Sequence, residues 1–242
     1  MKVEQIFIKF YWFGVVLLCA GLIFYGANRY IQMMTERSLL EYEEFREKSI
    51  RAAFAIQNHI NTEIDSLYQL RDVFRLRGGV LTRSEFGMIS GAILSRHDGI
   101  QALEWIPWVP HSKRELYEQK AIDEGLKDFG FKAILDDGRV GLSPVQEDYY
   151  PVYYIEPLAG NEKAAGLNLA SSKPRREALL KSIRTNKAVA SEGIRLIQEK
   201  KGQNGVLVFL PIDSESDPSL LLGVFRINDM ISSTFSNGVQ SL

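Results

Sequence analysis

The residue types that usually carry out catalysis or bind metals are few and scattered along this chain of 242 residues. Its histidines are His59, His97 and His111, and no two of them are separated by four residues, so they predict no metal site. Adjacent carboxylates occur at Asp136–Asp137, in a predicted turn, and at Glu147–Asp148, in a polar loop. The sequence has no nucleophile elbow, phosphate-binding glycine loop or dinucleotide-binding fingerprint. These residue types therefore predict no catalytic residue, no metal and no cofactor.

Cysteine content and charge exclude further classes of protein. Cys19 is the single cysteine, so neither an intrachain disulfide nor a cysteine metal site can form. The 29 basic and 30 acidic residues nearly balance, and the chain has no basic tail or basic stripe. Nucleic acid is therefore not an expected partner.

An uncharged run from Phe10 to Ala27 predicts a membrane helix. At about 1.5 Å per residue, the run would be about 27 Å long, close to the thickness of a bilayer core. Aromatic residues gather at both of its ends, as they do at membrane interfaces, and Lys2 and Lys9 precede it. We therefore expect a cytoplasmic N-terminus over residues 1–9, a single transmembrane helix over residues 10–29 in the inner (plasma) membrane, and a large extracytoplasmic (periplasmic) domain.

Two other interpretations of this run stay open. A cleaved signal peptide also has a positive start and an apolar centre, but Tyr25 stands where a cleavage site ending at Ala27 needs a small residue. A buried core helix would show an apolar stripe, whereas this run is apolar all round. A retained anchor fits these features best.

A long amphipathic helix is predicted to follow over residues 30–77. Proline and glycine are absent from Ile31 to Leu76, and apolar residues recur at helical spacing between Ile50 and Phe74. Gly78–Gly79 ends the pattern. A helix of this length exceeds what one small domain needs, so we expect part of it to pack on a second copy, giving a homodimer. For its C-terminal half, the alternative is that the stripe covers the core of its own domain.

Beyond the two glycines, strand and helix patterns predict an α+β domain with a mainly antiparallel sheet. Thr82 and Glu85 have the spacing of a capping box at the start of a short helix. Further helices are expected at Ser112–Leu126 and Lys173–Thr185. The expected strands are Ile100–Val109, Phe129–Leu135, Tyr149–Leu158, Val189–Ala190, Ile194–Gln198, Val206–Ile212 and Leu220–Ile227.

Two turns and one boundary complete this prediction. Asp136–Asp137–Gly138 and Gln203–Asn204–Gly205 are hairpin turn signals. The polar segment Asp213–Ser219 is a candidate boundary. Residues from Leu220 onward then either add to the main domain or begin another unit.

Four stretches of the sequence together resemble one known family. They are ALEWIPWVP (Ala102–Pro110), EDYYPVYYIEPLAGNEKAAGLNLASS (Glu147–Ser172), TNKAVASEGIRLIQEKKGQNGVLVFLPI (Thr185–Ile212) and GVFRINDMI (Gly223–Ile231). In order and spacing they are similar to the CHASE domain, the extracytoplasmic sensory module of bacterial receptors and plant cytokinin receptors. The resemblance spans about residues 45–231, and a membrane helix followed by a long helix also fits the layout of the family.

The resemblance implies a fold and a division of the chain. It implies a long helix that supports two PAS-like α+β units in tandem, with a small-molecule pocket in the membrane-distal unit. Residues 78–212 would form that distal unit, and residues 213–242 would form a linker and the start of the membrane-proximal unit. A family member normally continues to a second membrane helix and an output domain, such as a histidine kinase or a diguanylate cyclase, and we recognise no such domain in this sequence.

The resemblance also implies where a ligand would bind. Asn168 aligns with the acidic residue that bonds the adenine ligand in the plant receptors, so this chain departs from the cytokinin pattern but keeps a polar anchor. Ala190 and Ser191 align with strand residues that line the pocket, and Arg195 aligns with a basic residue typical of the family. The predicted ligand-binding residues are Asn168, Ala190, Ser191 and Arg195, with Trp105, Tyr153, Ile155 and Phe209 as apolar walls.

Each of these residues also has a structural interpretation. Asn168 can satisfy backbone groups at a turn, and Arg195 can pair with Glu156 or Glu162. Aromatic residues on strands usually belong to a core. Gly160–Asn161–Glu162 is expected to form a tight turn rather than a binding loop.

Two functions are consistent with these features. In the first, which the resemblance favours, the chain is a membrane-anchored sensor, and a small molecule in the distal unit shifts the long helix against a partner copy. In the second, the PAS-like unit binds no ligand and serves as a dimerisation or interaction scaffold in a membrane complex.

Overall fold

The computed structural model describes residues 2–195, 204–212, 218–230 and 232. It forms two compact units, residues 1–54 and residues 55–241, and helix α1 (Lys2–Leu76) contributes to both. In the first unit, the side chains of α1 from Trp12 onward are almost all exposed. Among the described residues, α1 is the helix long and apolar enough to cross a membrane; the mean hydropathy of its apolar window is 1.4 and none of that window is buried. This exposure favours an anchor over a core helix.

The second unit is built on a six-stranded antiparallel sheet. Five strands follow the order β6-β1-β10-β9-β7, and β8 pairs with β9 at the same edge as β7. Numbered along the chain, the five strands have the order 2-1-5-4-3, which is that of a PAS-like unit. The bounds of the strands are β1 Ile100–Ile106, β6 Tyr154–Glu156, β7 Val189–Ala190, β8 Ile194–Arg195, β9 Asn204–Pro211 and β10 Leu220–Arg226.

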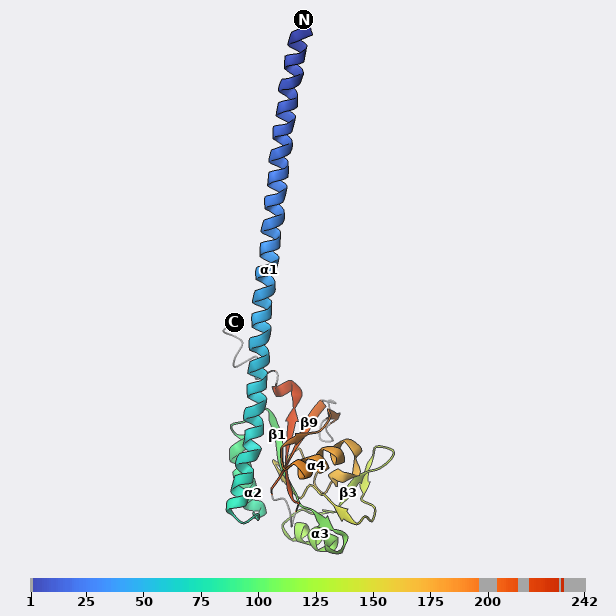
Figure 1. Cartoon of the computed structure of the whole chain (residues 1–242). Helices are drawn as coiled ribbons and strands as arrows, with labels where there is room; N and C mark the ends of the chain where they lie inside the picture. The colour runs from blue at the N-terminus through green and yellow to red at the C-terminus, as the bar shows by residue number, and fades with distance from the viewer. Residues whose placement is uncertain (1, 196–203, 213–217, 231, 233–242) are drawn as a thin grey trace. The chain divides into compact units, whose positions relative to one another are not determined.

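Helices cover both faces of this sheet, and Figure 1 shows the sheet between them. We call one face the α1 face, because it packs on the end of α1 and on α2 (Arg83–Leu94). The opposite face, called the α4 face, packs on α4 (Lys173–Thr185). The α1 face carries Leu103, Trp105, Tyr154, Val208 and Leu221, and the α4 face carries Ala102, Ile106, Ile155, Phe209 and Leu222.

The remaining elements lie in the segments that join the strands. Helix α3 (Arg114–Asp123) follows a short 3-10 turn, His111–Lys113, and a second such turn, Leu169–Ser171, precedes α4. Two small antiparallel sheets pair β2 (Val109–Pro110) with β5 (Asp148–Tyr149), and β3 (Lys132–Ile134) with β4 (Val140–Leu142).

Local sequence signals determine several of these bounds, as expected. The α1 helix ends at Leu76, and Gly78 and Gly79 adopt positive φ angles of 71° and 82° directly after it. Thr82 and Glu85 form both hydrogen bonds of the predicted capping box. Helix α4 has the predicted bounds, with a proline in its first turn. The hairpin turn expected at 136–138 joins β3 to β4, with Gly138 at φ 79°.

Other local predictions were wrong in detail. The strand expected at Ile100–Val109 is interrupted after Ile106, and the strand expected at Tyr149–Leu158 is two short strands that belong to different sheets. Asn204 and Gly205 do not form a hairpin turn, because both are in β9 and pair with β8. The third residue of that predicted turn, Gln203, lies outside the described residues.

The strand at Leu220–Arg226 adds to the main domain, which was one of the two alternatives. It forms β10, which pairs with β1 on one side and β9 on the other, so it is a central strand of the sheet. The polar segment before it is therefore not a boundary between units, since the strands on either side of it pair from Pro211 and Leu220 onward. Ala55–Ser241 accordingly form one compact unit.

Candidate ligand site on the α4 face of the sheet

A single row of side chains crosses the α4 face of the sheet. Ile155 on β6 lies opposite Glu104 on β1, and Glu104 lies opposite Leu222 on β10. Leu222 in turn lies opposite Phe209 on β9, which lies opposite Val189 on β7. Because residues in register share one face, these five side chains are neighbours. The row is apolar except for the carboxylate at Glu104.

Glu104 is buried and has no hydrogen-bond partner among the residues that the structure describes. Its residue is only 2% exposed, and within the described part of the chain its carboxylate accepts no hydrogen bond. Burial raises the pKa of this carboxyl to about 8, and the guanidinium of Arg175 offsets part of that rise. A buried charge without a partner is costly, so this position is unusual for a residue whose only role is packing.

Arg175 is the cation whose charge acts on the pKa of Glu104. It lies in the first turn of α4 and is 6% exposed, and among the described residues its guanidinium donates no hydrogen bond. Burial lowers its pKa, and the Glu104 carboxylate counteracts this effect. Each of the two groups therefore shifts the pKa of the other. Within the described residues, however, they form no ion pair.

Asn168 is fully buried and holds a turn together. Its Oδ1 accepts hydrogen bonds from the backbone N–H groups of Tyr150, at 3.0 Å, and Ala170, at 3.2 Å. Its Nδ2 donates to Oε1 of Gln146 at 3.1 Å. These contacts match the structural interpretation of this residue, in which the side chain satisfies backbone groups at a turn.

A pocket of about 340 Å³ lies beside Asn168. Its walls include Gln146, Tyr150 and Ala170, which are the three residues that hydrogen-bond to the Asn168 side chain. Glu147, Asp148, Arg176 and Leu180 complete the lining. Asn168 therefore positions the walls of this pocket rather than facing it.

An Asn168→Ala variant should lose stability whether or not a ligand is present. The change removes the acceptor of two backbone N–H groups, one buried and one partly buried, which should lower the free energy of unfolding by about 2 kcal/mol. Urea denaturation followed by tryptophan fluorescence would measure this loss. Asn58→Ala, on an exposed part of α1, is the control and should change stability little. Unchanged stability with weakened ligand binding would instead assign Asn168 to ligand contact.

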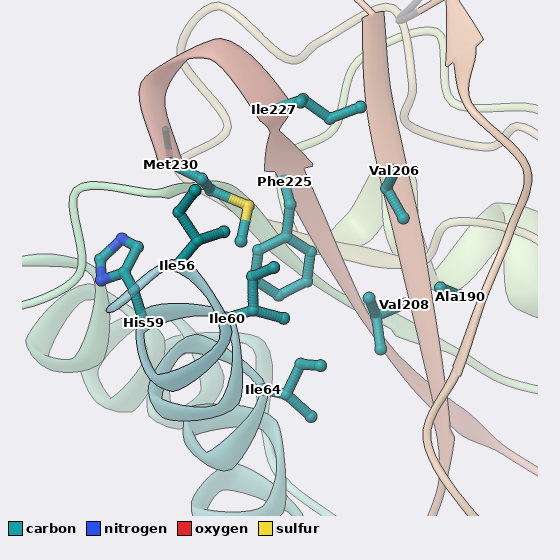
Figure 2. Close-up of a pocket in the computed structure, with 10 residues that line it drawn as sticks. All are labelled: Ile56, His59, Ile60, Ile64, Ala190, Val206, Val208, Phe225, Ile227 and Met230. Atoms are coloured by element: carbon teal, nitrogen blue, oxygen red, sulfur yellow. The ribbon is translucent and has the colours of Figure 1, made fainter. Parts of the chain in front are cut away.

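Two neighbouring predicted residues, Ala190 at the end of β7 and Ser191 directly after it, have different surroundings. Ser191 is buried, and its hydroxyl donates to the carbonyl of Glu192 and accepts from the backbone N–H of Leu207 at 3.1 Å. Ala190 is exposed and lines a pocket of about 220 Å³ on the α1 face (Figure 2). Arg195 is in β8, but its side chain lies outside the described part of the chain, so its predicted pairing stays a prediction.

The predicted apolar walls lie on both faces of the sheet. Trp105 and Tyr153 belong to the aromatic cluster of the α1 face, where Trp105 stacks on Phe74 with ring centroids 6.3 Å apart. The hydroxyl of Tyr153 donates to the carbonyl of Tyr117, and burial raises its pKa. Ile155 and Phe209 instead belong to the α4 face. The eight predicted residues are therefore not the lining of one pocket.

A second group of ionisable residues, centred on Glu63 of α1, was missed in the sequence. Glu63 is 2% exposed, with Nδ1 of His97 3.2 Å and Nε2 of His59 3.6 Å from its carboxylate oxygens. Burial raises the pKa of Glu63, and the two histidines counteract the rise. The spacing of four residues between His59 and Glu63 was the signal that could have revealed it. Among the described residues, no set of three or more side chains is arranged to hold a metal ion.

Comparisons with known proteins identify the domain but not the ligand. None of the curated proteins matches the chain significantly. Matching solved structures include an extracellular ligand binding receptor from Desulfohalobium retbaense DSM5692, at 9% identity and TM-score 0.46 over 78% of this chain. Another is described as Methyl-accepting Chemotaxis protein X, at 11% identity and TM-score 0.36 over 76% of this chain. This chain spans only 26% and 65% of their lengths.

The family comparison is more specific, because it covers most of the second unit. The model of the CHASE domain matches residues 80–241, which include every strand of the sheet described above. The chain therefore belongs to the CHASE domain family of extracytoplasmic, non-catalytic sensory domains.

Proposed function

We propose that this chain is the membrane-anchored input part of a receptor, which binds a small molecule on the α4 face and signals through its long helix. Family membership and the apolar start of α1 support this proposal. Residues 1–9 would lie in the cytoplasm, residues 10–29 would cross the inner membrane once, and residues 30–77 would carry the sensory unit as a stalk. The kinase or cyclase output would belong to a part of the receptor outside these 242 residues.

The division of the chain that we propose differs in one respect from that expected from the sequence. The distal sensory unit includes β10, because this strand lies in the middle of its sheet. The linker to a membrane-proximal unit would therefore begin after Arg226 rather than after Ile212.

The burial of Glu104 is the observation that carries the proposal of ligand binding. An acidic side chain at the centre of an apolar row destabilises the empty domain, since its desolvation is not offset by a hydrogen bond from a described residue. Such a group is retained more readily when it has a role in recognition. Ile155 and Phe209 would be apolar contacts of the ligand, because both lie in the same row.

The apolar residues of α1 between Ile50 and Phe74 suggest which part of the helix would form a dimer interface. Leu67, Leu70 and Phe74 are fully buried against the sheet of their own domain. Ile50 and Phe54 are 48% and 66% exposed. We therefore propose that the homodimer forms through the stalk before residue 55, while the rest of the stripe covers the domain core.

The test is a ligand screen on the full chain in lipid nanodiscs. Thermal stability would be measured against adenine derivatives, amino acids and carboxylates, with a Glu104→Leu variant in parallel. A ligand at about 100 times its dissociation constant should stabilise the native state by about 2.7 kcal/mol. We expect one class of compound to stabilise the wild type and not the variant.

The scaffold alternative gives a different result. If the folded chain dimerises through its stalk and no compound in the panel changes its stability, the sensor proposal is contradicted and a scaffold is favoured. A compound that stabilises the wild type and the Glu104→Leu variant equally would keep the sensor but move the site away from the α4 face.

A further inference from the structure

Two buried ionisable side chains, on opposite layers of the α4 core, have no hydrogen-bond or ion-pair partner among the described residues, and together they indicate a class of ligand. Glu104 comes from the sheet and Arg175 from the helix that covers it. Their residues are 2% and 6% exposed, and within the described residues neither side chain forms a hydrogen bond or an ion pair. Because buried ionisable groups are normally hydrogen-bonded or paired, each of them would be stabilised by a counter-group.

The helix end on which Arg175 lies favours an anion. The first turn of α4 has three basic residues and no acidic one, and Ser172 at the N-cap makes no capping hydrogen bond with its side chain. The N-terminus of a helix carries partial positive charge and unsatisfied N–H groups, both of which favour negative groups. A planar guanidinium there matches the two oxygens of a carboxylate.

Glu104 requires the opposite kind of group. A cationic nitrogen beside it favours the ionised form, which can only accept hydrogen bonds, so Glu104 is complemented by a cation that bears N–H donors. Its neighbours in the row, Ile155 and Leu222, are aliphatic and cannot donate from their side chains. A neutral purine could donate to Glu104 but would leave Arg175 without an anion.

We infer that the site binds a small zwitterion, whose carboxylate pairs with Arg175 and whose ammonium group pairs with Glu104. This inference rests on the proposed function, because it names the ligand class of the same site. A short hydrocarbon segment between the two charged groups would lie against Phe209 of the sheet and Leu179 of α4, both fully buried in this core.

The experiment uses the full chain in nanodiscs and a series of unbranched ω-amino acids, from glycine to 6-aminohexanoate. Each is compared with the carboxylate alone, the amine alone and the N-trimethyl derivative, which keeps its charge but has no N–H donor. We expect one chain length to bind, as measured by calorimetry, and each analogue that lacks a group to bind with an affinity lower by about tenfold or more. This comparison needs no variant, so it does not depend on whether a substituted domain folds.

Variants of Glu104 and Arg175 then test whether these two side chains bind the amino acid. Glu104→Gln and Arg175→Gln should each weaken binding of that amino acid by about tenfold or more. Glu177→Gln and Arg184→Gln make the same chemical changes at exposed positions of α4 and should leave affinity unchanged.

Two results would overturn the inference, and they separate it from the proposed function. If the metabolite screen finds a ligand that depends on Glu104 but lacks one of the two charges, the zwitterion is wrong while the sensor stands. The inference is also wrong if no ω-amino acid binds and a crystal structure of the empty domain has only water between Glu104 and Arg175. Water molecules would then be the hydrogen-bond partners of both side chains. If the wider metabolite screen also finds no ligand, the sensor proposal fails as well.

Discussion

Between about pH 5 and pH 8, a Glu104→Gln variant should lose about 3 to 5 kcal/mol less stability than the wild type. Burial raises the pKa of the Glu104 carboxyl to about 8 from its usual value of 4.5. Each pH unit between the two values corresponds to about 1.4 kcal/mol of free energy. The effect is not reduced by solvent screening, because the residue is almost fully buried.

The direction of the change follows from the protonation of each state. Below about pH 4.5 the carboxyl is protonated in both the folded and the unfolded chain, so the free energy of unfolding includes no cost for burying its charge. As the pH rises toward 8, the unfolded chain ionises while the folded chain stays protonated, and the unfolded state is favoured. The loss is complete above about pH 8, where both states are ionised.

Urea denaturation at pH 5, 6, 7 and 8 would measure this dependence. Glu177→Gln, at an exposed position of α4, is the control and should follow the wild-type profile. Parallel profiles for wild type and Glu104→Gln would mean that Glu104 is ionised at neutral pH in the folded domain and has a partner there.

Gly166→Ala should destabilise the domain by about 3 kcal/mol or more. Gly166 has a φ of 81°, which a side chain tolerates poorly, and a β-carbon at this position would overlap the carbonyl oxygen of Gly130. The backbone cannot move aside easily, because Gly166 donates to the carbonyl of Val152 and accepts from the N–H of Lys132, both at 2.8 Å. The expected cause is therefore a combination of torsional strain and steric overlap.

Gly160→Ala separates these two causes. Gly160 has nearly the same φ, 85°, but a β-carbon there would meet no atom within 4 Å. This variant should lose only the torsional part, about 1 kcal/mol. Equal losses for the two variants in urea denaturation would show that the close approach of Gly130 is unimportant.

The elements that could be predicted from the sequence are those determined by neighbouring residues. The capping box at Thr82 and Glu85 and the bounds of α4 depend on contacts within one or two turns of helix. The turn at residues 160–162 is likewise local, since the N–H of Gly160 donates to the Glu162 carboxylate.

The sheet could be predicted only in part, because strand pairing depends on residues far apart in the chain. The position of β10 between β1 and β9 could not be derived from the polar segment that precedes it, which resembles a linker in composition. The assignment of Asn204 and Gly205 to a turn failed for the same reason. Their residue types favour a turn, but pairing with β8 overrides that preference.

The ionisable residues of the candidate site, Glu104 and Arg175, were missed, and the apolar ones were predicted only in part, because the strands of this sheet are apolar on both faces. Trp105 and Ile155 were both expected to face the pocket, but β1 and β6 are registered so that Trp105 lies opposite Tyr154 and Ile155 lies opposite Glu104. The sequence does contain a signal for Glu104, which alternates in phase with Ala102 and Ile106 and so had to be buried with them.

The central position of β10 affects how the domain can fold during its synthesis. Residues 220–226 leave the ribosome last among the described strands of this sheet, yet they separate β1 from β9 in the finished sheet. Until they arrive, β1 and β9 each present an unpaired edge, which is the kind of surface that promotes aggregation. Folding of the sensory unit must therefore wait for its final strand to be exported, and a chaperone that shields strand edges would be most useful to the nascent chain at that stage.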